Sequence, residues 1–191
     1  MNDPKIREHF KKLYLSKVGK DVNRDIIIVD ELGIMQGESI ADLAAITPHS
    51  LECYEIKSGV DTLYRLPKQM ENYNKVFDYI SIITEEKYLK KVEEMVSSFW
   101  GIILTEDHGE TVSFKHHRIP SPNVLVDKRK VVELLWRNEV YQLLHKHGIK
   151  GISKMSRSKL WDVLCNTIDL PVLRTEIFIC LKRRVDWKEP I

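Results

Sequence analysis

Long apolar runs are missing from this sequence of 191 residues. No stretch approaches the roughly 20 consecutive apolar residues that span a bilayer, so we expect neither a transmembrane segment nor a membrane partner. The first 17 residues, MNDPKIREHFKKLYLSK, are charged and amphipathic. They lack the apolar stretch of about 7 to 15 residues that marks a secretory signal, which predicts a cytoplasmic protein.

The sequence also has few cysteines and no large excess of positive or negative charge. Cys53, Cys165 and Cys180 are odd in number and widely spaced, which fits reduced core thiols better than a disulfide framework or a structural zinc site. Lys and Arg total 30 against 28 Asp and Glu, a formal net charge of +2. Such a mild excess does not identify a nucleic-acid binder by itself.

What the chain does contain is short apolar runs alternating with helical patterns. We expect helices at 4–18, 62–76 and 86–96, and strands at 26–29, 39–46, 51–58, 79–84 and 101–105. The loop at 47–50, Thr-Pro-His-Ser, has the turn chemistry of a hairpin between antiparallel strands. The alternation of strand and helix that follows predicts an α/β fold with a mixed sheet flanked by helices.

Prolines interrupt this pattern between residues 117 and 123, at Pro120 and Pro122. Beyond them we expect three helices, at 127–147, 156–169 and 171–187. We therefore divide the chain into a core, residues 1–120, and a C-terminal helical subdomain, residues 124–191. The subdomain is a candidate surface for DNA or a protein partner.

Three charged residues lie on predicted strands that should otherwise be apolar. Asp42 is flanked by Ala41 and Leu43, while Glu55 and Lys57 lie two positions apart and so point to one face. Charges on a buried strand cost desolvation energy unless they pair or bind a cation. The cluster therefore indicates a site, which we expect at one edge of the sheet.

Two carboxylates and one ammonium group suit a divalent cation and a phosphate. Oxygen atoms of Asp42 and Glu55, with the backbone carbonyl of Ile56, would hold Mg²⁺ or Mn²⁺. Lys57 would orient the attacking water or offset charge in the transition state.

The following helix carries a polar stripe. Gln69 and Tyr73 lie four positions apart and share a face, and Arg65 lies one turn earlier. We expect this stripe to support the metal site and to hold a DNA backbone.

The order of these motifs resembles the PD-(D/E)XK nuclease superfamily, in particular its QxxxY branch of RecB-like and phage-exonuclease-like domains. A closer similarity is to a little-characterised family of bacteria and phages. Its motifs match here at 31–33 (E-L-G), 37–42, 55–58 (E-I-K-S) and 61–73 (D-T-L-x-R-L-x-x-Q-x-x-x-Y). The resemblance covers about residues 1–105 and continues into 135–139. It implies a restriction-endonuclease-like core and metal-dependent hydrolysis of DNA phosphodiester bonds.

The superfamily also carries a glutamate on its first helix. Glu8 is the candidate by position and Glu31, before Leu32 and Gly33, is the candidate by local motif, so we take Glu31 as the preferred further metal ligand and keep Glu8 open. Ile40 stands where relatives often have arginine, which puts a substrate contact from that position in doubt.

Plainer interpretations exist for the same residues. Asp42, Glu55 and Lys57 could form a cross-strand salt-bridge cluster, and the Gln69–Tyr73 stripe could be ordinary helix packing. A nuclease fold without catalysis would act as a nucleic-acid-binding or regulatory protein. His116 and His117 point in opposite directions on an extended chain, so we expect no metal role for them. Trp136, Trp161 and Trp187 are expected as core anchors of the helices.

Overall fold

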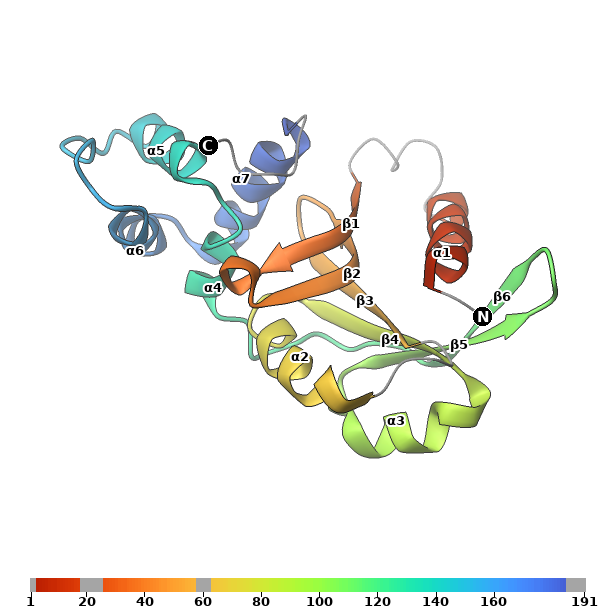
Figure 1. Cartoon of the computed structure of the whole chain (residues 1–191). Coiled ribbons are helices and arrows are strands. Elements are labelled where there is room, and N and C mark those ends of the chain that lie inside the picture. Colours follow the sequence, from red (N-terminus) through yellow and green to blue (C-terminus); the bar gives the residue numbers. More distant parts are fainter. Residues whose placement is uncertain (1–2, 18–25, 58–62, 185–191) are drawn as a thin grey trace.

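A six-stranded sheet occupies the centre of the computed structural model, which describes residues 3–17, 26–57 and 63–184 (Figure 1). The strands lie in the order β1 (Ile27–Ile34), β2 (Ser39–Ile46), β3 (Leu51–Lys57), β4 (Tyr79–Glu85), β5 (Gly101–Asp107) and β6 (Val112–Arg118). The helices are α1 (Asp3–Lys17), α2 (Leu66–Tyr73), α3 (Leu89–Met95), α4 (Lys128–Val132), α5 (Arg137–Lys146), α6 (Arg157–Thr167) and α7 (Leu170–Lys182).

The pairing of the strands makes the sheet mixed. Strands β1, β2 and β3 pair antiparallel, β3 to β5 pair parallel, and β6 returns antiparallel to β5. The mixed α/β fold and the hairpin across 47–50 are therefore confirmed, the latter with Leu43 opposite Tyr54 and Ile46 opposite Leu51. The expected position of Glu55 and Lys57 at a sheet edge is wrong, because β3 has hydrogen-bonded neighbours on both sides.

Each face of the sheet buries its own apolar cluster, because successive side chains of a strand alternate between faces. Helix α1 covers one face, where Ile6 and Phe10 pack with Leu43, Ile56 and Ile83. Helices α2 and α3 cover the other face, as Figure 1 shows. The parallel crossovers from β3 to β5 therefore run over the face opposite α1.

Several elements differ from the sequence predictions. Strand β1 continues through Gly33 to Ile34, and the turn comes only at the 3-10 segment η2 (Met35–Gly37). The expected helices at 62–76 and 86–96 begin as 3-10 turns, η3 (Leu63–Arg65) and η4 (Glu86–Tyr88). Strand β6 was not predicted, because its side chains are mostly polar and its pairing with β5 decides its conformation. Some ends of the predicted elements lie outside the described ranges: residues 18, 58 and 62, and residues 185–187.

The predicted helix at 127–147 is wrong, because it is two helices, α4 and α5, separated at 133–136. Leu134 and Leu135 are buried in this break. The Glu139 carboxylate accepts the Trp136 backbone N–H at 2.7 Å, which caps the start of α5. Burial of two leucines and a local cap thus outweigh the helical periodicity.

The C-terminal helices share the apolar cluster of the sheet. One cluster includes Val29 and Leu32 of β1 together with Leu135, Leu164 and Ile177. Polar contacts reinforce the connection: Arg174 pairs with Asp78, its Nε 3.1 Å from Asp78 Oδ2, and Thr175 donates to the Pro48 carbonyl at 3.2 Å. The core and the helical subdomain thus bury apolar surface against each other.

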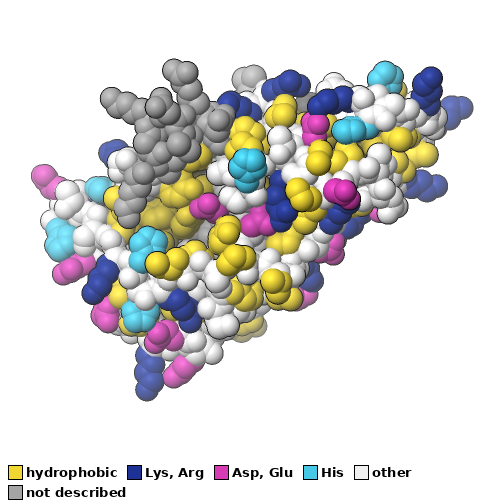
Figure 2. All heavy atoms as spheres, turned by 180° about the vertical axis from the view of Figure 1, so that it is seen from behind, with side chains coloured by type: hydrophobic (Ala, Val, Ile, Leu, Met, Phe, Trp, Pro, Cys, Tyr) yellow, Lys and Arg dark blue, Asp and Glu magenta, His cyan; other side chains and the backbone are white. Residues whose placement is uncertain are grey.

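Within the described ranges, none of the helices combines the length and the apolarity needed to cross a bilayer. Figure 2 shows the side of the molecule opposite to that of Figure 1, where basic, acidic and apolar side chains are interspersed. Charge on this side therefore does not single out a nucleic-acid surface.

Candidate active site on strands β2 and β3

The Glu55 carboxylate is the centre of the candidate site. It is fully buried, and Lys57 Nζ and Gln69 Nε2 each lie 2.6 Å from its Oε1. The Tyr73 hydroxyl lies 2.7 Å from its Oε2. The structure thus brings together four of the predicted residues, two from β3 through the strand alternation and two from α2 through the helical spacing.

Helix α2 is held against β2 by polar contacts. The Tyr73 hydroxyl lies 2.7 Å from the Ile40 carbonyl, and Asn72 donates from Nδ2 to Ser39 Oγ at 2.7 Å. The Tyr73 ring stacks on Trp100 with centroids 6.2 Å apart. Burial, reinforced by the charge of Glu55, raises the pKa of Tyr73 well above its ordinary value. The hydroxyl therefore stays protonated and can donate to Glu55.

Asp42 lies where β2 and β3 separate. The backbone pairing of these strands stops at Leu43 and Tyr54, and Asp42 Oδ2 accepts the Ile56 N–H at 2.8 Å in place of a backbone carbonyl. Burial, followed by the charge of Glu55, raises the pKa of Asp42 from 3.8 to about 7. The carboxylate is thus short of compensating positive charge in this conformation.

Glu31 is next to Asp42 in space, on the neighbouring strand. The pairing of β1 with β2 skips exactly this position, and Glu31 adopts a left-handed backbone with φ 56°. Arg7 of α1 contacts both acids: Nη1 is 3.2 Å from Glu31 Oε1 and Nη2 is 3.6 Å from Asp42 Oδ1. Glu8 instead pairs with Lys12 on the outside of α1. Of the two open candidates, Glu31 is therefore the one placed beside Asp42.

Arg7 is a site residue that no motif of the sequence indicates. Its position directly after the buried Ile6 would have placed it at the border of the apolar stripe of α1, but only the packing of α1 on the sheet shows which acids it meets.

A left-handed non-glycine residue costs about 1 to 3 kcal/mol and such strain clusters at functional sites. Glu31 thus adds a second feature typical of a site.

The donor atoms of the site fit a hard divalent cation. Over residues 3–17, 26–57 and 63–184, no group of three or more His, Cys, Asp or Glu side chains is placed to hold a metal ion. Mg²⁺ does not require one, because it usually keeps several waters and binds through one or two carboxylates. Asp42, Glu55 and the Ile56 carbonyl supply such oxygens, and a cation would favour the ionised form of Asp42 against the burial and the Glu55 charge that raise its pKa.

Arg65 belongs to the surroundings of this cluster. It lies in η3, ahead of α2, and is exposed. It borders a groove that is also lined by Gln69, and Gln69 in turn contacts Glu55. Arg65 is therefore placed beside the path to the cluster and not within it.

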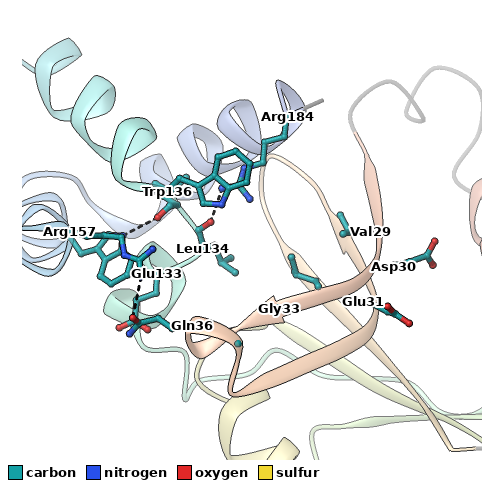
Figure 3. A pocket seen from close by; sticks show the side chains of 14 residues that line it. Val29, Asp30, Glu31, Gly33, Gln36, Glu133, Leu134, Trp136, Arg157 and Arg184 are labelled. Carbon is teal, nitrogen blue, oxygen red and sulfur yellow. Dashed lines mark hydrogen bonds between the residues drawn. The ribbon is translucent and has the colours of Figure 1, made fainter. Parts of the chain in front are cut away.

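A second cavity, of about 390 Å³, lies between β1 and the C-terminal helices (Figure 3). The side chains of Asp30 and Glu31 point away from Trp136 and Arg157 across it. Trp136 lines the cavity under the Arg184 guanidinium, 4.0 Å from the ring centroid; it is only half-buried and is not part of the apolar cluster, so its predicted role as a core anchor is wrong.

The other aromatic and histidine residues considered in the sequence have structural positions away from the candidate site or lie outside the described ranges. Trp161 is buried, 2% exposed, which confirms it as a core anchor, whereas Trp187 lies outside the described ranges. His117 Nε2 lies 2.9 Å from Glu93 Oε1, in a surface pair. Neither Trp161 nor His117 belongs to the cluster around Glu55.

Comparison with known proteins identifies the family. The model of the bacteriophage P4 protein cII family matches residues 3–189, so this chain belongs to that family. It is 28% identical over 165 residues to protein cII of Enterobacteria phage P4, covering 86% of this chain. The match spans 62% of that relative's length. A protein of unknown function from Silicibacter pomeroyi superposes over 70% of this chain and 87% of its own, at 12% identity and a TM-score of 0.42.

Proposed function

We propose that this protein is a metal-dependent nuclease of the PD-(D/E)XK type that hydrolyses DNA phosphodiester bonds in the cytoplasm. The observation that carries the proposal is the buried Glu55 carboxylate, contacted by Lys57, Gln69 and Tyr73, with Asp42 on the next strand. Acids and a lysine clustered in a buried position are costly unless the charges pair or bind a cation, and such clusters gather at functional sites.

Each residue of the cluster has a role in this proposal. Asp42 and Glu55, with the Ile56 carbonyl, would hold Mg²⁺ or Mn²⁺, which would supply Lewis-acid activation of the phosphodiester and of a water. Gln69 and Tyr73 donate to the two oxygens of Glu55 and so orient it.

Lys57 and Arg65 act on the nucleic acid. Lys57 carries an ammonium group beside Glu55, where it offsets negative charge that develops on the phosphate. Arg65, on the neighbouring groove, contacts the DNA backbone.

One observation favours a second candidate, a nuclease fold that binds nucleic acid or regulates without catalysis. Both oxygens of Glu55 already accept hydrogen bonds, and the Lys57 side chain is only 4% exposed. A closed cluster of this kind stabilises a fold without needing a metal. Glu55 Oε2 accepts the Tyr73 hydroxyl and has a second lone pair, so a cation would bind Glu55 through this oxygen or displace Lys57 or Gln69 from Oε1.

The deciding experiment incubates linear and circular DNA with the full chain and Mg²⁺ or Mn²⁺, with EDTA as the blank. Asp42→Asn and Lys57→Ala remove two of the proposed functional groups, and Lys12→Ala is the matched control because Lys12 pairs with Glu8 on the surface. Circular dichroism confirms that each variant is folded.

Metal-dependent cleavage that both site variants abolish and Lys12→Ala retains would support the nuclease. Cleavage of the circular substrate would add that it cuts internally. Absence of cleavage of either DNA with either metal would favour the non-catalytic candidate.

A further inference from the structure

A groove of about 570 Å³ opens beside the candidate active site, between the start of β2 and the segment from η3 to α2. Its volume falls within the range of roughly 300 to 1,000 Å³ typical of ligand pockets. Gln69 lines this groove and also contacts Glu55 at 2.6 Å. A ligand in the groove is therefore one side chain away from the proposed reaction centre.

The groove presents two large apolar side chains to solvent. Tyr64 is 90% exposed and Ile40 is 53% exposed, and both line it. An exposed aromatic ring is a platform on which an unpaired base stacks, whereas the bases of a duplex already have both faces covered. This combination suits an unpaired nucleotide better than an intact double helix.

The polar groups of the groove suit the same ligand. Arg65 and Lys68 line the groove with two positive charges against the negative charge of Glu38; Lys68 also pairs with Glu71 beside the groove at 3.3 Å, so Arg65 is the main candidate for a phosphate contact. Among the described residues, the buried Oε1 of Gln69 has no hydrogen-bond partner. Because this oxygen is buried, an N–H group of a base would reach it only after the Gln69 side chain turns toward the groove.

We propose that this groove binds an unpaired nucleotide of single-stranded DNA, its base against Tyr64 and Ile40 and its phosphate near Arg65 and Lys68. Delivery of the adjoining phosphodiester to Glu55 rests on the proposed nuclease function, but the binding itself does not. Ile40 then serves as an apolar contact for the base.

The test is fluorescence anisotropy of a labelled single-stranded oligodeoxynucleotide in EDTA, so that cleavage plays no part. The wild-type chain is compared with Tyr64→Ala and Tyr64→Phe, and with Ile119→Ala, which removes another largely exposed apolar side chain, 76% exposed, outside the groove. A blunt duplex and an oligoribonucleotide of the same sequence are run in parallel.

We expect Tyr64→Ala to bind single-stranded DNA at least about fivefold more weakly, the loss of one base stack, and Tyr64→Phe and Ile119→Ala to bind like the wild type. The duplex should bind more weakly than the single strand. Unchanged binding by Tyr64→Ala, equal binding of the duplex, or Tyr64-dependent binding of RNA but not DNA would overturn the inference.

The two proposals fail separately. Tyr64-dependent binding in EDTA by a protein that cleaves no DNA with Mg²⁺ would keep the binding groove and reject the nuclease. Cleavage of single-stranded DNA by Tyr64→Ala with an unchanged KM would keep the nuclease and reject the groove.

Discussion

Lys57 Nζ lies 2.6 Å from Glu55 Oε1, and the two side chains are 4% and 0% exposed. Removing one member of a buried pair leaves the other charge uncompensated, at a cost of about 3 to 5 kcal/mol. We predict that Lys57→Met lowers the free energy of unfolding by about this amount. The double variant Lys57→Met/Glu55→Gln should be less destabilised than the sum of its single variants, which urea unfolding followed by circular dichroism measures. Additive losses would mean that the pair does not couple.

Asp42 predicts a pH dependence of stability in the metal-free protein. Its folded pKa is raised to about 7 from 3.8, so across this window the folded state holds a proton that the unfolded chain has released. The free energy of unfolding therefore falls as pH rises, by up to about 1.4 kcal/mol per pH unit. Asp42→Asn, which keeps an acceptor for the Ile56 N–H, should lose less stability between pH 4 and 7 than the wild type does.

The exposed Asp30 provides the control for this measurement, because it pairs with Lys11 on the surface. Asp30→Asn should follow the wild-type curve in urea titrations at each pH. Superimposable curves for Asp42→Asn and the wild type would contradict the predicted role of Asp42.

Binding of Mg²⁺ should show in thermal unfolding without any nucleic acid. A ligand that binds only the folded state stabilises it, by about 2.7 kcal/mol at a concentration of 100 times Kd. We predict that Mg²⁺ raises the Tm of the wild type at pH 8 and leaves that of Asp42→Asn unchanged.

Comparing Glu31→Gln with Glu8→Gln then decides which glutamate takes part, and Glu31→Gln should show the smaller Mg²⁺-induced shift in Tm because Glu31 lies beside Asp42. Equal shifts in the wild type and Asp42→Asn would reject Asp42 as a ligand.

Backbone strain at Glu31 predicts an unusual preference for glycine. Glycine adopts the left-handed conformation at no steric cost, whereas alanine keeps the strain of φ 56°. Glu31→Gly should therefore be more stable than Glu31→Ala by about 1 kcal/mol in urea unfolding. At the adjacent Asp30, which is not among the left-handed residues, the order should reverse, with Asp30→Gly less stable than Asp30→Ala. If alanine were the more stable residue at both positions, glycine would not release any strain at position 31.

The shared apolar cluster predicts that a chain ending near residue 123 does not fold stably. Truncation would expose Val29 and Leu32 and remove the Arg174 partner of Asp78. We expect such a fragment to lack a cooperative unfolding transition in calorimetry. A cooperative transition would show instead that the core folds alone and that the helices are an independent unit, free to serve a protein partner.

The local patterns of the sequence were enough for much of the sheet and the cluster. The hairpin of β2 and β3 follows from its turn residues. The crossovers to β5 follow from short apolar runs that alternate with helical patterns. That Glu55 and Lys57 share a face, and that Gln69 and Tyr73 share one, follows from the repeat of a strand and of a helix. Such regularities depend on neighbours a few positions apart, and a single sequence displays them.

Tertiary packing decided the rest. It paired the polar strand β6 with β5, broke the helix between α4 and α5 to bury two leucines, and placed Arg7 against Glu31 and Asp42. It also placed Tyr64 and Ile40 on one groove. Arg7 and the two acids, like Tyr64 and Ile40, lie well apart in the chain, and whether such residues meet depends on how helices and strands bury their apolar faces together, which no local pattern encodes.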